Sequence, residues 1–205
     1  MRPEVSWIWV LPPLATSLVV LAHPIIDPWQ DGVAGLAPLV AHNDVWLAVH
    51  LALLALFPLS ALALIQAVSG IESTGARLAR RMLAVFAVLY AGFDTFAGLS
   101  TGTIIRAARE LGAVEQSGVL LTVKALFNSP INGALFVFGT ASWTLGAGAV
   151  AATLWWTSAP RTPVVLIAIA APLLFLDHPA PFGPVTFAAV AAALAWLAWS
   201  GPAKD

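Results

Sequence analysis

The chain has 205 residues, of which 60% are hydrophobic and only 9% are charged, with a formal net charge of −1 and no cysteine. A soluble domain carries about 25% charged residues, so this composition excludes an ordinary water-exposed surface and fits a surface in contact with lipid. The lack of cysteine excludes disulfides, thiolate ligands and cysteine nucleophiles. The scattered basic residues form no patch for nucleic acid. We expect an all-α, polytopic integral membrane bundle in one domain, residues 1–205.

Six stretches in chain order are predicted to be transmembrane helices: 6–22, 45–69, 82–105, 131–156, 163–176 and 185–200. A crossing needs about 20 apolar residues, so the shorter stretches are the weaker candidates, and five helices is the alternative. A signal peptide is the alternative for the first stretch, but no small-x-small cleavage site follows it, which favours a retained anchor.

Two connections between these stretches are long. Residues 23–44 are polar and rich in proline and glycine, with an apolar middle, 33–41, that we expect in or near the membrane interface. Residues 106–130 alternate charged and apolar side chains, a pattern that predicts an amphipathic helix at the outer face.

The distribution of basic residues predicts the orientation, because cytoplasmic loops carry an excess of Lys and Arg. With six crossings, one side receives Arg2, Arg77, Arg80, Arg81, Arg161 and Lys204, and the other receives Arg106, Arg109 and Lys124. We therefore expect both termini in the cytoplasm. The excess of Arg (seven) over Lys (two) suggests a GC-rich genome. We expect the chain in a bacterial inner (plasma) membrane.

All four histidines fall on the outer side of this topology: His23, His42, His50 and His178. Asp44 and Asp177 lie on the same side. Imidazole and carboxylate without thiolate suit zinc, copper or iron, so these six residues are candidate ligands for a divalent transition metal or a haem. His42 and His50 are eight residues apart, too far for one small ion, so each would need a partner from another segment.

His50 is the strongest of these candidates, because it lies inside an apolar helix where an ionisable side chain is costly. We expect it to lie near at least one of the other histidines, with Asp177 or Asp44 within reach of the same site. The alternative is that the histidines are only polar helix ends, which contact water and headgroups.

Asp94 is the ionisable residue deepest in a predicted span. It shares a helix face with Tyr90, Gly98, Thr101 and Gly102. The two glycines form a small-xxx-small pair that lets another helix approach closely, so we expect Asp94 to face the bundle interior. It is either a structural hydrogen-bonding group or a proton-relay or ligand residue, with Tyr90 and Thr101 as candidate companions.

Three functions are compatible with these residues. The first is an accessory or structural subunit of a membrane complex, with lipid, other membrane subunits or a second copy of the chain as partners. The second is a metal- or haem-binding redox protein that uses His50 and His178. The third is a proton-coupled transporter of small solutes that uses Asp94. No phosphate-binding glycine loop, His-Glu-x-x-His motif or nucleophile elbow is present, so the sequence predicts no particular reaction.

Overall fold

The computed structural model describes residues 5–27, 33–176 and 178–200, and every regular element in these ranges is helical. The elements are η1 (Trp7–Val10), α1 (Leu11–Leu21), η2 (Ala34–Leu36), α2 (Ala37–Ala41), α3 (Asn43–Gln66), α4 (Thr74–Phe93), the π-helix η3 (Asp94–Ser100), α5 (Thr101–Ala107), η4 (Ala108–Glu110), α6 (Ala113–Phe127), α7 (Pro130–Trp155), α8 (Arg161–Leu176) and α9 (Phe182–Trp199). The predicted all-α class is confirmed.

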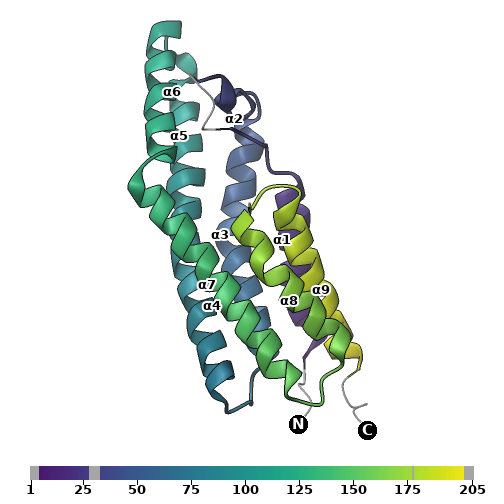
Figure 1. Ribbon diagram of the computed structural model, residues 1–205. Helices are drawn as coiled ribbons and strands as arrows, with labels where there is room; N and C mark the ends of the chain where they lie inside the picture. The colour runs from purple at the N-terminus through teal and green to yellow at the C-terminus, as the bar shows by residue number, and fades with distance from the viewer. Residues whose placement is uncertain (1–4, 28–32, 177, 201–205) are drawn as a thin grey trace.

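The long helices form a closed ring. Each of α1, α3, α4, α7, α8 and α9 packs against the next in chain order, and α9 packs back against α1. The helices run alternately up and down, so that the α3–α4 and α7–α8 connections lie at the same end of the molecule as the start of α1 (Figure 1). The other end of the ring is where α1 and α8 finish.

Four helical stretches in the described part of the chain are long and apolar enough to cross a membrane: Asn43–Gln66, Thr74–Glu110, Pro130–Trp155 and Phe182–Trp199. The helices Trp7–Leu21 and Arg161–Leu176 are apolar but shorter. They correspond to the predicted crossings 6–22 and 163–176. Four of the six expected crossings therefore meet the length that a bilayer requires.

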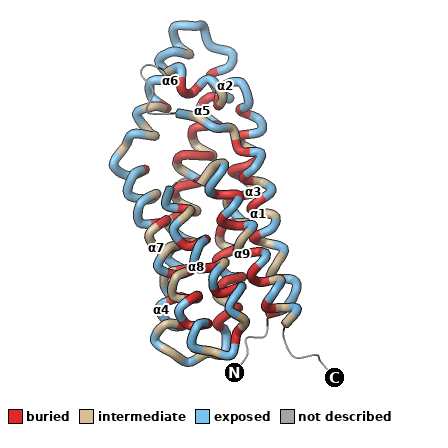
Figure 2. The backbone as a smooth tube through the Cα atoms, turned by 45° about the vertical axis from the view of Figure 1, so that its right-hand side comes forward, coloured by how far each residue is buried: buried red, intermediate tan, exposed pale blue. Residues whose placement is uncertain are grey.

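Aromatic side chains fill the centre of the ring. Phe57 of α3 contacts Tyr90 of α4, with ring centroids 4.8 Å apart, and Phe187 of α9, at 5.6 Å. Trp143 of α7 packs on Phe187 at 5.2 Å. Buried residues follow these inward faces, whereas the outward faces are exposed (Figure 2). The outer surface is rich in leucine, valine and tryptophan, as expected for lipid contact.

The stretch from α4 to η4 forms one long helical rod. It begins at Thr74, before the predicted start at Met82, because Ser73 caps it by accepting a hydrogen bond from the Ala76 amide at 3.1 Å. At 1.5 Å per residue, its 37 residues extend about 55 Å. The hydrocarbon core of a bilayer is about 30 Å thick, so a rod that crosses it must also project from it.

The projecting part is an arm made of α5, α6 and α2. The predicted amphipathic helix over 106–130 is replaced by the end of α5, the short η4 and then α6, which runs back alongside α5 rather than across the end of the ring (Figure 1). Val123 is the buried residue of α6, and most of this helix is exposed (Figure 2). The apolar segment 33–41 packs inward, where Leu36 and Leu39 join a cluster around Trp46.

Candidate metal centre

Three of the four histidines converge where the ring meets the arm. His23 directly follows α1, His50 lies in α3, and His178 follows α8. One ring nitrogen from each lies within 4.8 Å of the other two. The Nε2 atoms of His23 and His50 are 3.3 Å apart. We expected His50 to lie near at least one of the other three histidines, and it lies near two of them, His23 and His178.

The hydrogen bonds of the other ring nitrogens define the tautomers. The Nδ1 atom of His50 lies 2.8 Å from the Trp46 carbonyl oxygen, and that of His23 lies 2.8 Å from the Pro24 carbonyl oxygen. A carbonyl can only accept, so both Nδ1 atoms carry the hydrogen. In two neutral imidazoles both Nε2 atoms then present a lone pair, and these lone pairs face each other across 3.3 Å.

Burial disfavours a proton as the bridge between these lone pairs. His23 and His50 are 6% and 3% exposed. Burial lowers the pKa of His23 to about 4, against the ordinary value of 6.5. The pKa of His178 also lies well below its usual range, first because it is buried and then because His23 and His50 are close. The site therefore holds neutral imidazoles near neutral pH, the form that coordinates metal ions.

Close helix contact holds His50 in place. A Cβ atom at Gly98 would lie 1.9 Å from the His50 Cδ2 atom, so only glycine leaves room for the imidazole there. At Gly102 a Cβ would lie 2.7 Å from Leu47. The Trp46 indole donates a hydrogen bond to the Gly98 carbonyl oxygen at 2.8 Å. The Gly98–Gly102 face is thus the contact that the sequence predicted, and α3 is the helix that occupies it.

The His178 backbone is held by an equally tight contact. A Cβ at Gly183 would lie 1.6 Å from the His178 carbonyl oxygen, and the Gly183 amide donates to the Pro179 carbonyl oxygen at 3.1 Å. The first turn of α9 therefore packs directly on the segment that carries His178. Sequence reasoning did not single out Gly183, although its place in the turn-rich stretch before the last helix was visible.

Asp94 belongs to the same site. Its Oδ1 atom lies 3.9 Å from the His50 Nε2 atom, and the residue is 1% exposed. The Oδ2 atom is buried and has no hydrogen-bond partner among the described residues. Asp94 opens the π-helix η3, an irregularity that often marks functional sites. Among the described residues, the carboxylate beside His50 is thus Asp94 and not the predicted Asp44.

The remaining predicted site residues lie elsewhere. His42 is exposed at the start of α3. Asp44 is paired with Arg106 at 2.5 Å and Arg109 at 3.3 Å. Thr101 donates its hydroxyl to the carbonyls of Ala97 and Gly98, and Tyr90 packs in the aromatic core. Asp177 lies outside the described residues.

A cavity of about 430 Å³ adjoins the three histidines. His23, His50 and His178 form part of its wall, together with Trp46, Phe93, Phe127, Phe136, Leu176 and Asn132. Asn132, in the first turn of α7, was not among the site residues predicted from the sequence. The cavity reaches the surface beside Asp27 and Gly133, which are both exposed.

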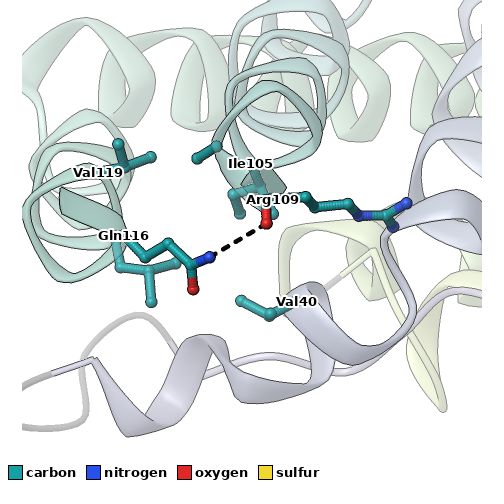
Figure 3. A pocket seen from close by; sticks show the side chains of 7 residues that line it. Val40, Ile105, Arg109, Gln116 and Val119 are labelled. Atoms are coloured by element: carbon teal, nitrogen blue, oxygen red, sulfur yellow. Dashed lines mark hydrogen bonds between the residues drawn. The ribbon is translucent and has the colours of Figure 1, made fainter. Parts of the chain in front are cut away.

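A second cavity, of about 110 Å³, lies in the arm. Val40 of α2, Ile105 of α5 and Val119 of α6 line it, and Gln116 Nε2 donates to the Arg109 carbonyl oxygen at its edge, at 3.3 Å (Figure 3). No histidine or carboxylate is among the described residues that line it. Of the two cavities, only the first is therefore lined by candidate metal ligands in the described part of the chain.

Comparisons with protein-family models, with curated proteins and with solved structures found no match to this chain.

Proposed function

We propose that this chain is an integral membrane protein that binds one divalent transition-metal ion through His23, His50 and His178. The observation that supports this most is the pair of facing Nε2 lone pairs at 3.3 Å, because both Nδ1 hydrogens are already donated to carbonyls. A cation between them removes the repulsion. Bonds from the non-coordinating ring nitrogen to a carbonyl are also the usual way in which proteins orient a ligating histidine.

The spacing suits a tetrahedral ion. Two nitrogens that each lie about 2.0–2.1 Å from a tetrahedral zinc ion are about 3.3 Å apart. His23 and His50 already have this separation. The widest separation in the group, 4.8 Å, needs only a side-chain adjustment of one to two ångströms. Three imidazoles with a carboxylate nearby and no thiolate favour zinc, copper or iron.

A bis-histidine haem is the less favoured cofactor. In that arrangement the porphyrin ring passes between the two axial imidazoles. Here the third imidazole lies within 4.8 Å of the other two, where it would meet the ring. An accessory subunit remains a compatible cellular role, with the metal centre as the part that it contributes. Asp94, the residue of the transport hypothesis, lies beside His50 and is assigned to this centre.

The membrane topology that we propose is the one predicted from the sequence. Four helices of sufficient length and two shorter apolar helices make six crossings, with both termini in the cytoplasm and the metal centre toward the outer face. Cysteine labelling tests this directly, because the natural chain has no cysteine. A cysteine at Ser69 should react only after the membrane is opened, and one at Gln116 should react in intact cells. The reverse pattern would contradict the orientation.

Metal binding is tested on the detergent-purified chain after chelation. Addition of Co²⁺ should give the visible absorption of a low-symmetry, four-coordinate site, and the titration should end at one equivalent. Zn²⁺ should then displace the Co²⁺ and bleach the absorption. The His23→Gln/His50→Gln double variant should show neither effect, with its helical content retained. Equal Co²⁺ binding by this variant would overturn the assignment.

A further inference from the structure

The wall of the 430 Å³ cavity has a clear chemical division. One part is the three histidines, and most of the rest is aromatic or aliphatic: Trp46, Phe93, Phe127, Phe136 and Leu176. No Lys or Arg occurs among the described residues that line it, and the carboxylate among them is that of the exposed Asp27. Such a wall disfavours anions and favours a small, mainly apolar molecule.

The wall also offers a fixed hydrogen-bond acceptor. Asn132 is 7% exposed and donates its Nδ2 hydrogen to the Phe127 carbonyl oxygen at 2.9 Å. This bond fixes the orientation of the amide. Its Oδ1 atom has no hydrogen-bond partner among the described residues. A buried acceptor without a donor costs about 1–3 kcal/mol, which a ligand with an N–H or O–H group can recover.

The metal centre has three histidine ligands in the described part of the chain, and all three line this cavity. A tetrahedral ion with three protein ligands keeps its fourth position for water or a substrate, which is the pattern of catalytic rather than structural sites. Among the described residues, the cavity provides the room for that position, whereas on the Gly98 side even a Cβ atom would lie 1.9 Å from the His50 ring.

We propose that the cavity is a binding chamber for a small neutral molecule with an aromatic or aliphatic body, one donor atom that ligates the metal, and one hydrogen-bond donor for Asn132. This proposal rests on the proposed metal centre. It deepens that function by assigning a ligand class to the open coordination position. Asp94, whose Oδ1 atom lies 3.9 Å from the His50 Nε2 atom, is the carboxylate beside this centre in the described part of the chain.

The test uses the Co²⁺-loaded protein and two probes, imidazole and 4-phenylimidazole. Both carry the metal-binding nitrogen and the N–H group, and only the second has an aromatic body. We expect 4-phenylimidazole to change the Co²⁺ spectrum with an affinity at least about tenfold higher than that of imidazole, because the phenyl ring is buried against the apolar wall.

Two matched variants locate the binding. At both Gly133 and Gly148 of α7, a Cβ would meet no atom within 4 Å, so both positions accept a side chain. Gly133 lines the cavity and Gly148 does not. Gly133→Phe should remove the preference for 4-phenylimidazole, and Gly148→Phe should keep it.

The outcomes separate the two proposals. If the protein does not bind Co²⁺, the metal centre is wrong, and this inference is wrong with it. If Co²⁺ binds but neither probe changes the spectrum, the fourth position belongs to the protein, and only the chamber is overturned. Equal affinities for the two probes, or an equal effect of both glycine variants, would also overturn the chamber.

Discussion

Two polar clusters join the same pair of helical rods at different heights, and their surroundings differ. Near the arm, Asp44 of α3 pairs with Arg106 and Arg109, and these three side chains are 65%, 54% and 45% exposed. Less than two turns further along α3, His50 lies 3.9 Å from Asp94, and both side chains are at most 3% exposed. The first cluster is satisfied by water and by its own charges. The second is buried, so its polar groups depend mainly on partners within the protein.

The comparison shows that burial, rather than residue type, decides what a polar group requires. Exposed ion pairs contribute about 0–1 kcal/mol, because solvent already stabilises each charge. A buried polar group that loses its partner costs several times as much. The facing Nε2 atoms and the Asp94 Oδ2 atom therefore make the buried cluster, of the two, the candidate for a ligand site.

The largest expected effect is on metal affinity, and it distinguishes His50 from the nearby His42. His50→Ala should weaken metal binding by about 1,000-fold, or about 4 kcal/mol. The variant lacks the imidazole ligand, and with it the hydrogen bond to the Trp46 carbonyl oxygen that orients the ring. His42→Ala should leave the affinity unchanged, since His42 is exposed. Competition with a chelator of known affinity measures both. Similar losses in the two variants would show that the buried cluster is not the metal site.

The stability of the metal-free protein should depend on pH. The folded-state pKa of His23 is about 4, below the ordinary 6.5, so the unfolded chain binds more protons between these values. Stability should therefore be constant above pH 6.5 and fall as the pH drops toward 4, by up to about 3 kcal/mol. Unfolding in denaturant at a series of pH values measures this. His23→Gln should flatten the profile, and an unchanged slope would contradict the buried neutral state.

Gly98→Ala tests the contact that supports His50. The added methyl group would lie 1.9 Å from the imidazole, so it should displace the ring. We expect a destabilisation of about 1–3 kcal/mol and at least a tenfold loss of metal affinity. Gly148→Ala, with no atom within 4 Å of the new methyl group, should be neutral or slightly stabilising. Thermal unfolding and Co²⁺ titration of both variants provide the comparison.

The smallest expected effect lies in the exposed cluster. Asp44→Asn should reduce stability by less than about 1 kcal/mol, and added salt should diminish even this difference. Metal affinity should not change. Denaturation at low and high salt measures the first effect. A larger loss would mean that the Asp44 pairs hold the arm in a way that its exposure does not indicate.

The sequence by itself determined the helical class and the candidate set. Apolar stretches of about 20 residues can satisfy their backbone groups in lipid only as helices, so composition and length were enough to predict them. Because successive crossings alternate in direction, the order of the spans was enough to place all four histidines on the outer side of the predicted topology. The glycine face at Gly98 and Gly102 was enough to predict a close helix contact. None of these three sequence patterns indicates which helix makes the contact or which side chains meet.

Only the tertiary structure decided the membership of the site. His23 and His50 are 27 residues apart, and their meeting depends on the ring closure that brings the end of α1 beside α3. Asp94 joined them because α3 packs on the π-helix, whose register helical periodicity does not predict. His42 was excluded because it lies between α2 and α3, about two helical turns from His50, where its side chain is exposed. Helical periodicity predicts which face of a helix a residue occupies, and the loops predict at which end of the bundle it lies. Distances of a few ångströms between side chains follow from packing alone.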